Sequence, residues 1–507
     1  MARISFGPCK EFMSTTMTLK HQVRGGIKWA SISMIATRAA RLITTFFLAR
    51  LLAPEAFGLV AITSITVELI RMMSEFGFGT AYVQRHYSSP EDDRRAANTI
   101  FWIGAFINVS LYLVATAATP LIVSCFTAPE AASLLRVLFL SLLLDIVGEV
   151  PRLDLQKRLQ FKSLSLCEIA QISVYTVVAL SMAFADAGAW SIIVGDLISK
   201  LVVSVLLFRA SKWRPGFMFD GIIARQLFNY GKFVWAFALL SGFGDAMDKL
   251  FVGRYYSAAD LGVYSMAFVL IMFPVTNISG IVNRVTFPLF SKLSQDRESL
   301  RDAFLKALAH VAILAFPVSV GIMAVGPILV SVLLSPKWLP TIPLISILTF
   351  YGLALALSSI TGPVFQAIGK PNAQFYTSIL HHTTKLALLF VFQRNGLTGI
   401  CYAVLIPMII SSLIAFILVT KFLNLSPVKL CMSLLRPAFA AGLMFLAVRM
   451  LSPIFNVSVT IPEIFELAVA VSVGITVYLG LSAATNHSTF QEFIESAGAI
   501  LRGREAA

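Results

Sequence analysis

Ten lysine and arginine side chains lie inside, or at the edges of, the long apolar runs of this 507-residue sequence: Lys28, Arg38, Arg41, Arg71, Arg136, Lys200, Lys249, Arg284, Lys385 and Arg436. A charge at the centre of a bilayer costs at least about 2.5–3.5 kcal/mol, so such residues usually face a polar cavity or an oppositely charged partner. The forked donors of arginine suit the oxygen atoms of carboxylates and phosphates. The chemistry that these residues can do is therefore the binding of anions.

The first two apolar runs carry the densest group of charges. Arg38 and Arg41 are three residues apart, so a helix places them on one face. Arg71 has Glu68 three residues before it and Glu75 four residues after it. One interpretation is an ion-pair ladder between the two runs, in which Glu68 and Glu75 neutralise Arg38 or Arg41. The other leaves Arg38, Arg41 or Arg71 with spare donors for an anionic ligand.

The segment that connects these two runs, which we call the corner, is repeated later in the chain. "FLARLLAPEAFGLVAI" aligns with "FVGRYYSAADLGVYSM" at an offset of 204 residues, which places Arg254 over Arg50 and Gly262 over Gly58. Each arginine ends an apolar run, where a cation suits the carbonyl end of a helix. We favour this capping role over the alternative, a gate or pivot. The two glycines are expected to let the chain turn tightly into the next run.

The same offset aligns charged positions of the two halves, and one aligned pair has opposite charges. Arg41 falls on Asp245, and Thr45 falls on Lys249. One hypothesis is that Arg41 and Asp245 meet across a central seam and stabilise one access state. The alternative is that Asp245 pairs with Lys249, four residues further along its own helix.

Two further basic residues stand apart from acidic neighbours. Arg284 has none within a helical turn, which makes it a candidate for contact with an anionic headgroup. The alternative is that it snorkels to the interface, because its run ends near Pro288. Lys385 shares a helix face with His381, which is more often a packing residue than a proton relay.

Breaks in the apolar runs suggest hinges. Pro274 and Pro317 each remove a backbone hydrogen bond, and Gly242 and Gly244 make another position at which a helix can bend. The alternative is that they are ordinary features, because proline and glycine are common in membrane helices.

The composition identifies the class of protein that must position these residues. Hydrophobic residues make up 57% of the chain and charged residues 13%, and the mean hydropathy is +0.82. About fourteen apolar runs approach or exceed the roughly 20 residues that a spanning helix needs. The sequence predicts an all-α polytopic membrane protein. The repeat predicts two six-helix lobes, 27–208 and 232–420, related by a pseudo-two-fold axis along the membrane normal, with two additional helices in 431–483.

The distribution of Lys and Arg predicts the orientation. With the N-terminus inside, the inner segments carry 25 of the 40 basic residues, and the outer loops carry only five: Arg50, Arg254, Lys337, Arg394 and Arg449. This asymmetry predicts that both termini are cytoplasmic. The net charge of +14 is explained by these loops, and no basic stripe with exposed aromatics indicates nucleic acid. The five cysteines have no metal-site spacing, so neither a metal nor a cofactor is expected.

The motif of the first two runs resembles a known family. "FFLARLLAPEAFGLVAI" followed by "FGFGTAYVQR" is similar to the start of the polysaccharide-export flippases of the multidrug/oligosaccharidyl-lipid/polysaccharide superfamily, of the exopolysaccharide and colanic-acid translocase type. The resemblance implies an undecaprenyl-pyrophosphate-linked oligosaccharide repeat unit, carried across the bacterial inner membrane by alternating access around a cationic cavity, for exopolysaccharide or lipopolysaccharide biosynthesis. The resemblance is also compatible with a polysaccharide polymerase and a chain-length regulator as protein partners, besides the membrane lipids.

The candidate headgroup-binding residues under this resemblance are Arg38, Arg41, Arg71, Arg284 and Lys249. A cation-coupled drug exporter of the same superfamily is the alternative, disfavoured because the first run carries two arginines and no acid. An enzyme is not expected, since no nucleophile–His–acid arrangement appears and no catalytic residue is proposed.

Overall fold

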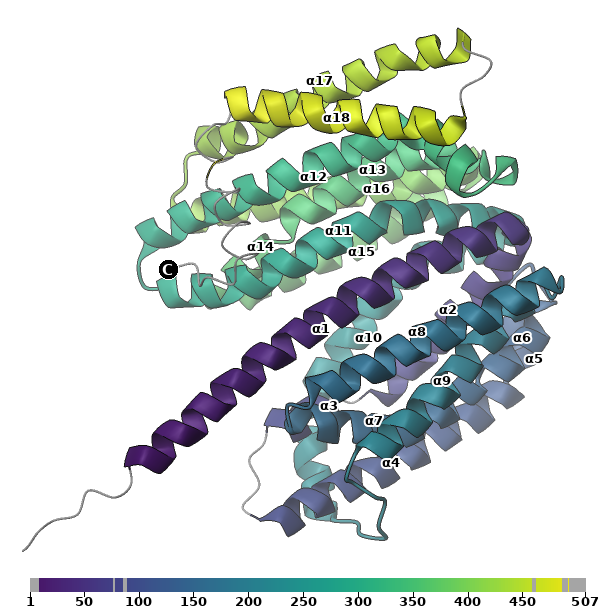
Figure 1. Ribbon diagram of the computed structural model, residues 1–507, viewed down its shortest axis with the longest axis vertical. Coiled ribbons are helices and arrows are strands. Elements are labelled where there is room, and N and C mark those ends of the chain that lie inside the picture. The colour runs from purple at the N-terminus through teal and green to yellow at the C-terminus, as the bar shows by residue number, and fades with distance from the viewer. Residues whose placement is uncertain (1–8, 76–77, 85–88, 458–461, 486–490, 492–507) are drawn as a thin grey trace, which may run out of the picture. The chain divides into compact units, whose positions relative to one another are not determined.

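The computed structural model describes residues 9–75, 78–84, 89–457, 462–485 and 491, and these residues form helices and short connections without a strand (Figure 1). The α-helices are α1 (Cys9–Leu51), α2 (Pro54–Ser74), α3 (Phe78–Gln84), α4 (Pro90–Ala117), α5 (Thr119–Ser124), α6 (Ala131–Leu138), α7 (Leu140–Lys157), α8 (Phe161–Phe184), α9 (Trp190–Ala210), α10 (Gly221–Tyr255), α11 (Ala258–Leu293), α12 (Arg297–Leu333), α13 (Thr341–Ser358), α14 (Thr361–Ala367), α15 (Pro371–Phe392), α16 (Gly396–Leu423), α17 (Pro427–Val457) and α18 (Glu463–Thr485).

Within the described residues, twelve stretches are long and apolar enough to cross a membrane. One of them, Pro371–Leu423, contains both α15 and α16, and the 35-residue α10 is not among them although its length suffices. Several predicted runs are pairs of shorter helices, such as α6 with α7 and α13 with α14. The predicted all-α polytopic architecture is confirmed, with a helix or helix pair at each of the fourteen apolar runs.

The chain divides into two compact units, Met1–Ala246 and Met247–Ala507. The division falls inside α10, between Ala246 and Met247, whereas the predicted second lobe begins earlier in that helix, at residue 232. The predicted lobes, the two-fold axis that relates them and the separate pair 431–483 stay predictions.

In the first unit, α8 packs along both α1 and α9. The α8–α9 contact is close because Gly195 faces Ala179: a Cβ added at Gly195 would lie 3.0 Å from the Ala179 Cβ and 3.3 Å from its Cα. Small residues at such contacts let membrane helices approach closely. The neighbour of Gly195 is Asp196, so this packing also fixes the position of a charged side chain.

Gly195→Leu is expected to destabilise the first unit by about 1–3 kcal/mol, because the added side chain overpacks a contact made partly by backbone. The measurement is the melting temperature in detergent. Gly442→Leu is the matched control, since Gly442 is exposed on α17 and a Cβ there meets nothing within 4 Å. Equal melting temperatures for the two variants would contradict the packing described.

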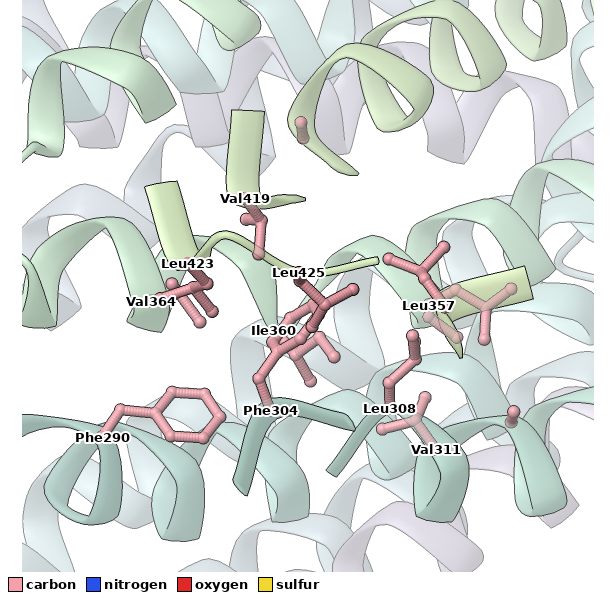
Figure 2. Close-up of a cluster of buried hydrophobic side chains, with 14 of the residues drawn as sticks. Phe290, Phe304, Leu308, Val311, Leu357, Ile360, Val364, Val419, Leu423 and Leu425 are labelled. Atoms are coloured by element: carbon pink, nitrogen blue, oxygen red, sulfur yellow. The ribbon is translucent and has the colours of Figure 1, made fainter. Parts of the chain in front are cut away.

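In the second unit, a buried apolar cluster joins α11, α12, α13, α14 and α16 (Figure 2). Phe290 of α11 and Phe304 of α12 are fully buried in it, together with Val364 of α14. The last two helices, α17 and α18, pack against α12, and the Tyr478 hydroxyl donates to the Ile313 carbonyl at 2.9 Å. The predicted additional helices are thus part of the second compact unit.

The glycines of the repeated corner do not make its turns. α1 ends at Leu51 and α2 begins at Pro54, so Gly58 lies inside α2, where it is buried. Gly262 likewise lies inside α11, which begins after the N-cap Ser257. The prediction that these glycines turn the chain was wrong. Proline at the helix start and a Ser/Asp capping box provide the two helix starts instead.

Candidate binding cavity

Three adjoining pockets in the first unit have volumes of about 450, 310 and 900 Å³. They are lined mainly by α1, α2, α7, α8 and α9, with single residues or short segments of α3, α4, α6 and α10. Gln171 of α8 lines all three, and we call them together the charged cavity. Its ionisable lining residues are Arg38, Arg41, Glu68, Arg71, Glu75, Asp145, Glu149, Arg152, Glu168, Tyr175, Asp196 and Lys200.

Among the cations of the charged cavity with a described ion pair, Arg41 has the most exposed side chain. Its Nη2 atom lies 3.7 Å from Asp196 Oδ1 of α9, and its guanidinium carbon lies 5.3 Å from the centre of the Tyr175 ring. The side chain is nevertheless 61% exposed. Since a guanidinium has five N–H donors, this position leaves Arg41 able to donate to an anion inside the cavity.

Arg71 is held from several sides instead. Its Nε atom donates to Asp145 Oδ2 at 2.9 Å, and its Nη1 atom donates to Glu68 Oε2 at 3.1 Å. Asp145 also lies 3.8 Å from Lys200 Nζ. Asp145 of α7 thus links two cations from α2 and α9, which favours a structural role for Arg71.

A third group of charges lines another part of the cavity. Arg152 Nη1 lies 3.8 Å from Glu168 Oε1, and the Ser33 hydroxyl donates to the other oxygen of Glu168 at 2.9 Å. Arg38 lines the same pocket and is exposed. Arg38 and Arg41 therefore line one pocket, which agrees with the shared helix face that their spacing predicts.

Basic and acidic residues are nearly balanced in this lining. Among the described lining residues, the five basic ones are Arg38, Arg41, Arg71, Arg152 and Lys200, and the six acidic ones are Glu68, Glu75, Asp145, Glu149, Glu168 and Asp196. In the described part of the first unit, the lining of the charged cavity is therefore not predominantly cationic. The cationic space predicted between the lobes stays a prediction.

Two members of the proposed ion-pair ladder have other described partners, and the rest of the ladder stays a prediction. Glu68 contacts Arg71 on its own helix. Arg41 contacts Asp196, which comes from α9 and lies far away in the sequence. The sequence alone shows the i,i+3 spacing of Glu68 and Arg71. It does not show that Asp145 of α7 and Asp196 of α9 contact arginines of α2 and α1.

The remaining candidates are distributed over both units. Arg50 and Arg254 lie in the last turns of α1 and α10, where the capping interpretation expects them. Lys249 lies 5.8 Å from the centre of the Phe268 ring. Asp245 is exposed on α10. Arg284 lies on α11, but its side chain is outside the described residues.

The hinge candidates all lie within helices. Pro274 is inside α11 and Pro317 is inside α12. Gly244 is buried on α10, and so is Gly242, which faces α2: an added Cβ there would lie 2.2 Å from the sulfur of Met72. The Gly242 site thus has a packing role besides the hinge role that stays a prediction.

A buried polar cluster in the second unit was not predicted from the sequence. Lys385 Nζ lies 3.4 Å from Asp248 Oδ1, and the Tyr264 hydroxyl donates to Asp248 Oδ2 at 2.7 Å. The side chains of Lys385 and Asp248 are only 3% and 4% exposed. The sequence shows Lys385 as a charge in an apolar run. The 204-residue offset draws attention to Asp245 as the acidic residue of this part of the chain, whereas the acid that contacts Lys385 is Asp248.

Comparison with known proteins places these features in a family. The chain is 27% identical over 471 residues to the teichuronic acid biosynthesis protein TuaB of Bacillus subtilis, covering 92% of this chain and 96% of that protein. It is 25% identical to the succinoglycan biosynthesis transport protein ExoT of Rhizobium meliloti, covering 96% and 98%. The structure of the lipid II flippase MurJ in an inward closed conformation superposes with a TM-score of 0.72 at 16% identity, covering 90% of this chain and 99% of MurJ.

The MurJ similarity shows the fold alone, because the identity is low. The family profile described as "Polysaccharide biosynthesis protein" matches residues 47–343, more than half of the chain. This match includes the repeated corner and most of the charged cavity of the first unit, and it confirms the resemblance drawn from the motif. The chain belongs to the polysaccharide biosynthesis protein family.

Proposed function

We propose that this protein is a flippase that moves a lipid-linked oligosaccharide repeat unit across the bacterial inner membrane for exopolysaccharide or lipopolysaccharide biosynthesis. The observation that carries the proposal is the family match over 47–343, supported by full-length relatives whose names place them in teichuronic acid and succinoglycan biosynthesis. A fold shared with a lipid II flippase agrees with it. The substrate class is an oligosaccharide on undecaprenyl pyrophosphate, and both termini are proposed to be cytoplasmic.

The charged cavity supports a stepwise path for the pyrophosphate. Arg38, Arg41 and Arg152 line one pocket of it, and Arg41 also lines the adjoining pocket, in which Arg71 lies; Gln171 lines both. Arg41 and Arg152 each pair with an acid of another helix, and the Arg38 side chain is exposed. A phosphate could displace one acid at a time, because a bidentate guanidinium–phosphate contact is stronger than a pair held at 3.7–3.8 Å. Alternating access then exposes the cavity to each side in turn.

Of the proposed headgroup residues, we give Arg41 and Arg38 the direct role in the first unit. Arg71 positions Asp145 and Glu68. Lys249 and Arg284 are proposed for the second unit. Arg50, Arg254 and Asp245 are kept as gate or pivot candidates, and Pro274, Pro317, Gly242 and Gly244 as hinge candidates.

A second candidate is a cation-coupled exporter of small molecules. One observation favours it: Glu75 and Glu149 line the widest pocket, where an acidic site could bind a cation. Drug susceptibility of a deletion strain separates the two candidates. Unchanged susceptibility together with lost polymer supports the flippase.

Deletion of the gene is expected to abolish the polymer and to leave repeat units on the cytoplasmic leaflet as undecaprenyl-pyrophosphate-linked oligosaccharide. The measurement is extraction and mass analysis of the lipid-linked oligosaccharides, beside a complemented strain. Normal polymer output from the deletion strain would reject the proposed function.

A further inference from the structure

Three large apolar side chains point outward where the chain passes from α9 to α10. Phe217 is 95% exposed, Phe219 is 63% exposed and Ile222 is 72% exposed. We call these three residues the Phe217 surface. Apolar groups that lie so close together in the chain and remain uncovered indicate a surface that contacts something besides water.

The backbone that carries the Phe217 surface is fixed on α4. Trp102 Nε1 donates to the Gly216 carbonyl at 2.9 Å, and the Gly216 amide donates to Asn98 Oδ1 at 3.1 Å. The Asp220 amide donates to Thr99 Oγ1 at 3.1 Å. The Phe217 ring stacks on the Trp102 indole, with centroids 5.3 Å apart and planes at 23°. The surface is therefore held outward by its attachment.

The points of attachment also fix its depth. α4 begins with the polar sequence "PEDDRRAAN", and its apolar stretch starts at the turn that contains Thr99 and Trp102. From Trp102 to Ala117 the helix extends about 22 Å further. On the other side of the loop, the membrane-length helix α9 ends at Ala210. Gly216 is thus held at the level where two membrane helices meet the interface, which is where tryptophan is enriched.

Basic residues flank the same loop. Arg209 and Lys212 are exposed, and Arg214 Nη1 donates to the carbonyls of Phe208 and Ser211 at 2.9 and 2.8 Å, which holds its charge beside the end of α9. Anionic lipids attract basic residues that lie near the membrane surface. Apolar rings with cations beside them match the two layers of a lipid interface.

We propose that the Phe217 surface is a lipid-binding anchor, seated in the boundary between headgroups and acyl chains of an anionic membrane leaflet. Phe217, Phe219 and Ile222 enter the acyl layer, and Lys212 with Arg209 contacts the headgroups. The anchor fixes the depth of the start of α10. This inference does not depend on the transported substrate.

The test uses a fluorescent bimane label in the full-length protein with its five native cysteines replaced, reconstituted in vesicles of phosphatidylglycerol and phosphatidylethanolamine. Three single-cysteine variants are compared: F217C, F106C as an exposed lipid-facing control on α4, and E91C as an exposed control in the first turn of the same helix. The quenchers are lipids carrying a nitroxide near the top of the acyl chain, and aqueous iodide.

The label at position 217 is expected to be quenched several-fold more by the shallow nitroxide lipid than the label at position 91, and several-fold less by iodide. Lys212→Gln, added to F217C, is expected to reduce the quenching in vesicles rich in phosphatidylglycerol. Strong iodide quenching without lipid quenching would overturn the proposal in favour of a surface in water. A label shielded from both quenchers would overturn it in favour of a second protein copy. Because Phe217 is almost fully exposed, the variant is expected to fold.

Discussion

Asp248→Ala is expected to lower the free energy of unfolding by about 3–5 kcal/mol, because it leaves the buried ammonium of Lys385 without its counter-charge. The same change removes the acceptor of the buried Tyr264 hydroxyl. The measurement is the melting temperature and the folded yield of a fluorescent fusion on size-exclusion chromatography. This is the largest stability effect that we expect from a single substitution in the second unit.

The double variant Asp248→Asn with Lys385→Met provides the control. It removes both charges together, keeps an acceptor for Tyr264 and preserves the approximate volume of each side chain. We expect it to be more stable than either Asp248→Ala or Lys385→Met, since no unpaired charge remains buried. A double variant that is less stable than both single variants would show that the ion pair is not the reason for the loss.

Arg41→Ala is expected to reduce polymer export by about ten- to a hundredfold at unchanged protein level. The physical reason is the loss of hydrogen bonds to an anionic headgroup, each worth about 1.5–3 kcal/mol when a charged group takes part. Arg41→Lys keeps the charge but not the fork, so an intermediate effect is expected. The measurement is secreted polymer per cell, with the amount of protein quantified in the membrane fraction.

Arg95→Ala is the matched control for this experiment. Arg95 is also an exposed arginine with one acidic partner, Glu91, at 2.8 Å, but it lies in the polar start of α4 and does not line the charged cavity. Its replacement is expected to leave export unchanged. Wild-type export from Arg41→Ala would remove this residue from the proposed path, whereas a loss accompanied by low protein level would point to folding.

The sequence was sufficient for the helices because their signal is local and strong. An unbroken apolar run must satisfy its own backbone hydrogen bonds in lipid, so it can only be a helix. Arg38 and Arg41 also required only the helical period to be placed on one face. The family was readable from the motif at the first corner, "LARLLAPEAFG", which the family match includes from residue 47 onward.

The partners that lie on other helices were decided by tertiary structure alone. Asp145 lies between Arg71 and Lys200 because α2, α7 and α9 line the same pocket. Asp196 reaches Arg41 because Gly195 lets α9 approach α8. Asp248 and Lys385 are 137 residues apart and meet only through the packing of α10 on α15. The helical period and the local composition predict only what happens within a few turns of one helix. Ion pairs between helices depend on which helices are neighbours, and packing decides that. The sequence by itself thus determined which charges lie in apolar runs, and only the fold determined which acids of other helices contact them.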